Sequence, residues 1–120
     1  MSQFNDTGYG SVTLTEAVGQ YLRTNAAGEL CGIAERGIGV ATRNGAVGDV
    51  MAVALHSKPG TVKVVASAAI AVDAIVYTAA SGKVGASAST AFPIGIAMTA
   101  AGADGDVFEI MPLVGETAVA

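Results

Sequence analysis

The sequence predicts an all-β domain, a small barrel or sandwich built on two related β-hairpins with an extended N-terminal arm. Three observations support this fold class. One segment occurs twice, and turn residues separate short apolar runs along most of the chain. Hydrophobic residues make up 52% of the 120 residues and charged residues 13%. A chain of this length and composition can bury a core as one domain without a metal or a disulfide.

The repeated segment reads as strand, glycine turn, Gly-Asp turn and strand. The first copy runs from Ile38 to Val53, and the second runs from Ile94 to Ile110. One additional residue in the second loop brings the two copies into register. Self-similarity of this kind predicts a duplicated β-hairpin. It assigns most of the glycines to architecture and leaves few for chemistry.

The region before the first copy is polar and less regular. Residues 1–10 are expected to form an arm with little intrinsic order. Strict alternation predicts a half-exposed strand over Ser11–Thr15. In residues 16–25 three apolar positions have helical spacing, but Gly19 interrupts any helix, so we favour extended chain. Glu29–Ala34 is expected as a short strand.

Between the copies, Asp73–Tyr77 is predicted as another strand, and Ser81–Lys83 as a hairpin turn after it. The alanine-rich residues 62–72 fit one strand, or a strand followed by a helical turn, and periodicity does not separate the two. Residues 87–90 read as a loop.

In total the pattern predicts about eight strands at intervals of roughly 8 to 12 residues. We divide the chain into an N-terminal arm and first strand region (1–25), a β-domain (26–114) and a C-terminal tail (115–120).

Charge and aromatic content argue against several functions. Six Lys and Arg residues are scattered singly against ten acidic residues, and Trp is absent. Neither a basic patch nor a stacking surface for nucleic acid can be built from this set. The first residues lack the pattern of a secretory signal, so folding in a cytosol is expected. Val84–Ala103 carries no charge, but its glycines, serines and proline argue against a membrane span.

No motif in the chain predicts chemistry. Asp49, Asp73 and Asp106 are expected to accept hydrogen bonds from the amides of their own turns. His56 is the only imidazole and Cys31 the only thiol, and nothing in the sequence places them together. Asp104-Gly105-Asp106 lacks the further ligands of a calcium loop. We therefore expect no enzyme, no catalytic residue, no cofactor, no metal and no small-molecule substrate.

The stretch from about Ile33 to Leu113 resembles the head decoration proteins, or capsid cement proteins, of tailed bacteriophages. The matching fragments, in order along the chain, are Gly32-Ile33-Ala34, Gly48-Asp49-Val50, Val53-Ala54-Leu55, Asp73-Ala74-Ile75-Val76-Tyr77, Gly82-Lys83-Val84, Pro93-Ile94-Gly95-Ile96-Ala97 and Gly105-Asp106-Val107. Two positions depart from the family pattern, since Val72 precedes the middle Asp and Thr78 follows the Tyr. The first 25 residues are also longer than the minimal pattern.

The resemblance implies a structural virion protein, made in the host cytoplasm, that binds the outer surface of a phage capsid and stabilises it. Its partner would be the major capsid protein, and it would act as a homotrimer. Such a protein needs apolar surface to bury against its partners and gains avidity when several copies bind together.

Aromatic and apolar residues in the polar N-terminal segment are the candidate capsid contacts. Phe4, Tyr9, Tyr21 and Leu22 are spaced along chain that is too polar to be core. We expect this segment to lie across the capsid and to order there. The alternative is a tail that binds nothing.

A biotinyl or lipoyl carrier domain is the main alternative from another class. Two related hairpins also make the flattened barrel of such domains, which carry a lysine at the tip of a hairpin. Lys83 lies in a predicted turn, but its neighbours Gly82 and Ser81 do not match the expected setting for modification.

Overall fold

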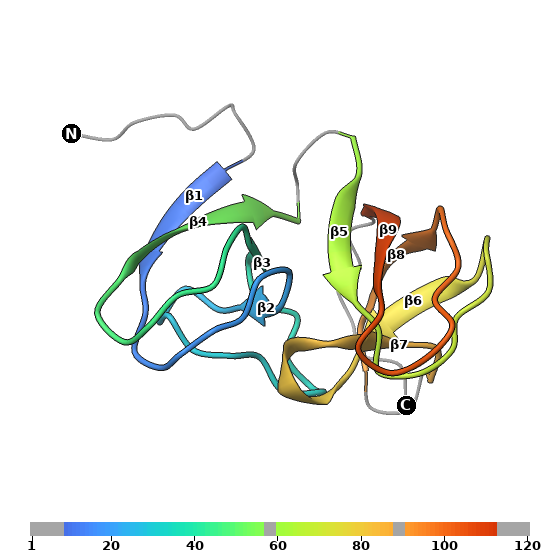
Figure 1. The fold of residues 1–120 in the computed structure, drawn as a ribbon, viewed down its shortest axis with the longest axis horizontal. Helices are drawn as coiled ribbons and strands as arrows, with labels where there is room; N and C mark the ends of the chain where they lie inside the picture. The colour runs from blue at the N-terminus through green and yellow to red at the C-terminus, as the bar shows by residue number, and fades with distance from the viewer. Residues whose placement is uncertain (1–8, 57–59, 88–90, 113–120) are drawn as a thin grey trace.

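The computed structural model describes residues 9–56, 60–87 and 91–112, and it confirms the all-β prediction (Figure 1). The strands are β1 (Tyr9–Thr13), β2 (Arg23–Thr24), β3 (Gly39–Ala41), β4 (Val50–Leu55), β5 (Val62–Val65), β6 (Ile75–Thr78), β7 (Val84–Gly85), β8 (Pro93–Ala97) and β9 (Val107–Pro112). One turn of 3-10 helix, Ala80–Gly82, joins β6 to β7. No helix in this part of the chain is long and apolar enough to cross a membrane.

The strands form two antiparallel sheets that lie side by side along the molecule (Figure 1). The first sheet has the order β1-β4-β3-β2, and the second has the order β5-β9-β8-β6-β7. Antiparallel strands joined by tight turns are what alternating apolar runs and Gly-Asp turns encode.

The two predicted hairpins are confirmed as β3–β4 and β8–β9, and their registers correspond residue by residue. The pairs are Gly39 with Leu55, Val40 with Ala54 and Ala41 with Val53 in the first copy, and Gly95 with Pro112, Ile96 with Met111 and Ala97 with Ile110 in the second. The strand glycines have a steric reason. A Cβ at Gly39 would lie 2.2 Å from the Ala54 carbonyl oxygen, and one at Gly95 would lie 2.6 Å from that of Met111.

The Gly-Asp turns are confirmed in both hairpins. Gly48 and Gly105 have φ of +90° and +92°, the left-handed conformation that glycine adopts without strain. The Asp49 carboxylate accepts a hydrogen bond from the Ala46 amide at 2.9 Å. The Asp106 carboxylate accepts two, at 2.8 Å from Gly102 and 3.1 Å from Ala103.

The structure extends the duplication well beyond the hairpins. β1 pairs with β4 as β5 pairs with β9, and β2 pairs with β3 as β6 pairs with β8. The isolated bridges correspond as well, since Val18 bridges to Gly45 and Ile70 bridges to Ala101. We call residues 9–56 the first unit and residues 60–112 the second unit.

Each unit also has a residue other than glycine in the left-handed conformation at the same place, before the second strand of the unit; Ser81, with φ of +60°, is a further one in the second unit. Tyr21 has φ of +68° and Asp73 has φ of +70°. The Tyr21 amide donates to the Ala41 carbonyl at 2.8 Å, and the Asp73 amide donates to that of Ala97 at 2.9 Å. The prediction that the Asp73 carboxylate accepts its own turn amides is wrong, because it accepts none in the described part of the chain.

The prediction of a strand over Glu29–Ala34 is wrong, because in that segment only Leu30 forms a bridge, to Thr24. Residues 62–72 form a strand followed by isolated bridges at Ala66 and Ile70, not a helical turn. β6 and β7 pair as the predicted hairpin around residues 80–82. The residues expected to form the N-terminal arm and first strand region include β1 and β2 of the first sheet. The tail, residues 1–8 of the arm and most of the loop at 87–90 lie outside the described residues.

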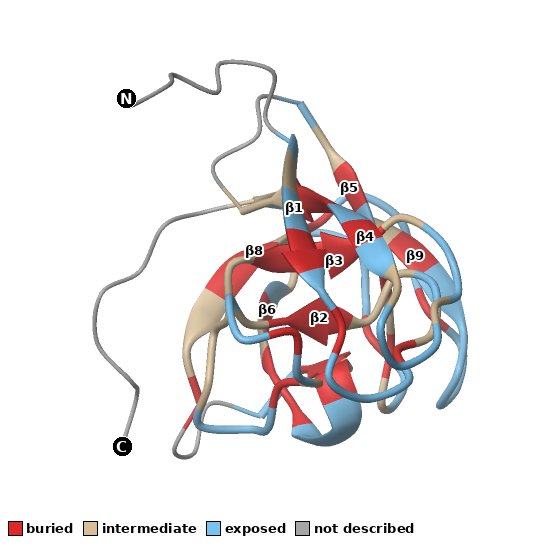
Figure 2. Ribbon diagram, turned by 90° about the vertical axis from the view of Figure 1, so that its left-hand side faces the viewer, coloured by how far each residue is buried: buried red, intermediate tan, exposed pale blue. Residues whose placement is uncertain are grey.

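The core lies in two clusters, and one of them joins the units. The first unit has its own cluster: Val12, Leu14, Val18, Ala41, Met51 and Val53. Val40 and Ala54 instead belong to the cluster of the second unit, which includes Val62 and Ile110. Figure 2 shows β2 and β3 buried at the centre of the molecule.

Candidate functional site

Equivalent faces of the two sheets differ in burial: one is covered by the other unit, and the other is exposed to solvent. Directly paired residues of antiparallel strands project to the same face of a sheet. In the first unit Arg23, Val40 and Ala54 form such a cross-strand row, which we call the first row. In the second unit the equivalent residues Ile75, Ile96 and Met111 form the second row.

The first row is buried and the second row is open. Arg23 is 0% exposed, Val40 2% and Ala54 9%. In the second row Ile75 is 49% exposed, Met111 is 41% exposed, and Ile96 is half-buried. The second unit covers the first row, whereas no part of the described chain fully covers the second row.

Arg23 ties the two units together. Its guanidinium donates hydrogen bonds to four backbone carbonyls: Gly32 and Glu35 of the first unit, and Ala79 and Lys83 of the second. Burial lowers the pKa of Arg23, since a charged form away from water is disfavoured. Four charge-assisted hydrogen bonds offset that cost, and they fix how the second sheet lies on the first.

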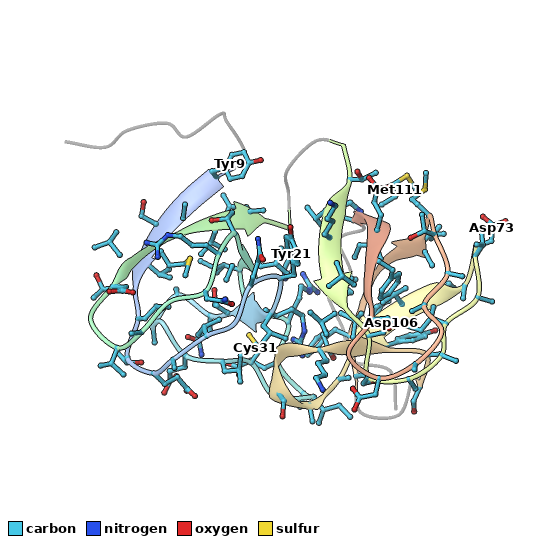
Figure 3. The ribbon with its side chains drawn as sticks, viewed as in Figure 1. Tyr9, Tyr21, Cys31, Asp73, Asp106 and Met111 are labelled. Carbon is cyan, nitrogen blue, oxygen red and sulfur yellow. The ribbon has the colours of Figure 1, made fainter. Side chains whose placement is uncertain are left out.

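A groove of about 160 Å³ opens between the units, beside the first row. Its lining includes Tyr9 and Tyr21 from the first unit and Thr61, Val62 and Lys63 from the second. The Lys63 ammonium lies 6.0 Å from the centre of the Tyr21 ring, within the range of a cation–π contact. Figure 3 shows both tyrosines on the side of the first unit that faces β5.

Tyr21 stands at a conformation that costs energy for a bulky side chain. A left-handed φ is tolerated by Gly, Asn and Asp but strained for tyrosine. The second unit has Asp73 at this position, which shows that the backbone geometry does not require an aromatic ring. Strained residues that persist are concentrated at functional sites. Tyr21 is therefore the strongest single candidate for a binding residue.

Further apolar side chains extend the second row. Val72 is 54% exposed, Met98 is 49% exposed and Val107 is 49% exposed. Figure 3 shows Met111 and Asp73 on the second unit, with Asp73 at the end farthest from the first unit. A hollow of about 220 Å³, lined in part by Lys63, Thr99 and Val107, lies on the same unit. Exposed apolar side chains that gather on one unit mark it as a candidate interaction site.

The structure brings two of the four predicted capsid contacts together. Tyr9 and Tyr21 line the groove between the units, and Tyr9 is 43% exposed. Leu22 is half-buried and packs against the core cluster of the first unit. Phe4 lies outside the described residues. The contact of these residues with a capsid stays a prediction.

The second row was not identified from the sequence, although a signal for it was present. Its strands are apolar at consecutive positions instead of alternating, as in Ile75-Val76 and Ile94 to Ala97. Continuous apolar character indicates a strand that is covered on both faces. That pattern would have marked the outer face of the second sheet.

The groups considered for chemistry are engaged in the fold. Burial raises the pKa of the Cys31 thiol to about 11, which makes it a poor nucleophile. The His56 imidazole bonds to the Arg36 carbonyl through Nε2 at 3.0 Å, and burial lowers its pKa. Within the described residues no cluster of His, Cys, Asp or Glu could hold a metal ion.

Lys83, the lysine of the carrier alternative, also has structural roles. Its ammonium pairs with the Asp104 carboxylate at 2.8 Å, and its carbonyl accepts a hydrogen bond from Arg23 at 3.0 Å. A lysine held at the junction of the units is poorly placed for a modifying enzyme that needs an exposed hairpin tip.

Comparison with known proteins gives a consistent result. Residues 10–112 match the model of a family described as phage cement protein. The fold is similar to that of a solved structure, the head fiber gp8.5 N base of bacteriophage phi29, with a TM-score of 0.69 and 17% identity. That similarity covers 85% of this chain and 90% of the phi29 chain. No curated protein matches the chain.

Proposed function

The chain belongs to the phage cement protein family and is a structural virion protein that binds a phage capsid, and we propose that it binds the outer surface of the shell as a homotrimer. Its partner there is the major capsid protein, and the trimer stabilises the shell by holding neighbouring capsid subunits. Several weak contacts made together give an avidity that one contact lacks. The role is structural and not enzymatic, and the protein is made in the host cytoplasm.

We further propose that the capsid contact is made by the N-terminal segment and the groove beside it, through Phe4, Tyr9, Tyr21 and Leu22. The observation that supports this most strongly is Tyr21, which lines the groove at a strained φ of +68°. Large aromatic side chains in such positions dominate the energetics of many protein interfaces. Leu22 contributes by fixing the backbone next to the ring.

Binding of purified variants to DNA-filled heads that lack the protein tests this proposal. The wild type should co-sediment saturably, and because the interior of such heads is closed, saturable binding reports the outer surface. Tyr21→Asn should weaken binding while the free energy of unfolding stays equal or rises, because Asn tolerates the left-handed conformation. Deletion of residues 1–8, which leaves every strand of the described chain intact, should also weaken binding.

The matched control is deletion of residues 115–120, which should leave binding unchanged. If that deletion abolishes binding while Tyr21→Asn binds fully, the proposed N-terminal contact is wrong and the capsid contact lies in the C-terminal tail. Light scattering on the purified protein measures the trimer separately.

A further inference from the structure

The duplication shows what an uncovered face of this fold accepts. Within one chain the first row is covered by β5 of the second unit, since Val62 of β5 packs in one core cluster with Val40 and Ala54. β5 is the edge strand of its sheet, so one strand edge of a unit lies against the row of the preceding unit. Repeated units usually bury such faces by stacking on one another.

The second row has no equivalent neighbour within the described chain, but the molecule does present a strand equivalent to β5. That strand is β1, which occupies the same edge of the first sheet and pairs there with β4. Ser11 and Thr13 of β1 are exposed, and Figure 1 shows β1 running away from the second unit, whereas its first residue, Tyr9, lines the groove beside β5. A neighbouring copy could therefore supply the missing strand.

We infer that the second row receives β1 of a second copy of this chain, repeating between copies the contact that β5 makes with the first row inside one copy. This inference rests on the proposed homotrimer and names its interface. The contact is heterologous, because each copy presents a row at one end and a strand at the other. Heterologous contacts close into a ring when the rotation between copies permits. Three copies would then form a ring of six units.

One pair of side chains at the equivalent positions is complementary, although Val62, which packs with Val40 and Ala54, corresponds to Gly10 in β1. Inside one chain Lys63 of β5 lies over the ring of Tyr21. The residue equivalent to Lys63 in β1 is Ser11, and the residue equivalent to Tyr21 in the second unit is Asp73. A serine hydroxyl donates well to a carboxylate. The Asp73 carboxylate is exposed and has no hydrogen bond or ion pair within the described chain, so it is available for this contact.

The residue that the first row buries as a charge is apolar in the second row. Arg23, which needs four carbonyl partners when buried, is replaced by Ile75 in the second unit. A neighbouring copy can cover Ile75, Ile96 and Met111 by simple apolar packing, without supplying partners for a charge. The row itself thus lacks a charge that would be costly to bury, while Lys63 and Glu109 lie beside it on the same face.

The test is the oligomeric state of the full chain, measured by size-exclusion chromatography with light scattering. The wild type should be a trimer, and Ile75→Glu and Met111→Glu should each shift dissociation to concentrations at least about 10-fold higher, an effect expected for a charge placed in an apolar interface. Both side chains are more than two fifths exposed in the single copy, so folding should be retained. Val47→Glu is the matched control, because Val47 is 67% exposed in a turn away from both rows.

A cross-linking experiment gives a positive readout for the same contact. The double variant Ser11→Cys with Asp73→Cys, treated with a short bismaleimide, should give covalent dimers and trimers, and neither single variant should. Cys31 is 1% exposed and its thiol pKa is raised to about 11, so it should not react in the folded protein.

The two proposals fail in different ways. A wild-type trimer that tolerates both glutamates and yields no cross-link would overturn this interface and leave the homotrimer standing. A wild type that is monomeric at every concentration would overturn the trimer and the interface together. Sedimentation with heads would still decide the capsid contact in either case.

Discussion

The two units of this protein share one backbone and differ in what their equivalent faces meet. The first row, built around Arg23, is buried against the second unit, while the second row, built around Ile75, is largely open. The same hairpin scaffold is therefore used once to assemble the chain and once to present a surface. The comparison teaches that duplication in a small β-protein can leave an apolar face exposed without new architecture. Substitutions at equivalent positions should separate stability from assembly.

The largest expected difference is between Arg23→Met and Ile75→Met. Methionine at position 23 removes the donor of four hydrogen bonds to buried or partly buried carbonyls, and those of Glu35 and Ala79 lose the donor that the structure gives them, so the free energy of unfolding should fall by about 1 to 3 kcal/mol for each carbonyl left unpaired. Methionine at the exposed position 75 should change it by less than about 0.5 kcal/mol. Urea unfolding at protein concentrations low enough to keep the chain monomeric measures both. Equal losses would mean that Arg23 does not hold the units together.

The next difference concerns the middle of each row. Val40 is 2% exposed, so Val40→Ala should cost about 1.5 to 3 kcal/mol through lost burial and the cavity that remains. Ile96 is half-buried, and Ile96→Ala should cost less in the single copy. If the trimer forms as proposed, the effect of Ile96→Ala should grow when unfolding is measured at concentrations where copies associate. An effect independent of concentration would argue against a covered second row.

A smaller difference is expected between the turn carboxylates. Asp106 accepts two turn amides and Asp49 accepts one, so Asp106→Ala should destabilise the protein by about 1 to 2 kcal/mol and Asp49→Ala by about 1 kcal/mol. Thermal unfolding of the two variants under the same conditions compares them. The reverse order would show that the contact of Arg43 with Asp49, at 4.0 Å and exposed, contributes more than its geometry suggests.

The smallest effect is a dependence on pH that belongs to the first unit. Burial lowers the pKa of His56 below its ordinary value of 6.5, so the folded state favours the neutral ring. The unfolded chain takes up the proton near pH 6.5, and the free energy of unfolding should be at its full value above that pH and fall as the pH drops below it. His56→Gln should remove this slope. Loss that begins only below about pH 4.5 would instead report Glu35, whose pKa is lowered chiefly by its hydrogen bond from Asn25.

The sequence was sufficient to predict the strands and turns in which side-chain chemistry and backbone geometry coincide. Gly48 and Gly105 mark positions of positive φ, and Asp49 and Asp106 accept their own turn amides. These local rules predicted both hairpins.

The wider duplication was not visible, because its equivalent residues share backbone hydrogen bonds and not side-chain type. Arg23 corresponds to Ile75 and Tyr21 corresponds to Asp73, and no sequence pattern relates such pairs. The continuous apolar residues of β6 and β8 marked the outer face of the second sheet, but they did not show that this face is open. Whether a row is covered depends on how one sheet lies on the other. The four hydrogen bonds from Arg23 to backbone carbonyls fix that arrangement, and two of them join residues far apart in the sequence.

The candidate capsid contacts were partly within reach of the sequence. The polar setting of Tyr9 and Tyr21 identified them as unusual, and the structure places both at one groove. Their meeting depends on the pairing of β1 with β4 and on the left-handed φ at position 21, which only the fold supplies.

A cryo-electron microscopy map of the decorated head tests the central claim most directly, namely that one unit builds the chain and the other presents its face to a second copy on the capsid. The map should show this domain on the outer surface in groups of three, with the side chains of Ile96 and Met111 covered by β1 of the neighbouring copy. Separate copies with this row facing solvent, or a shell without the domain on its outer surface, would contradict it.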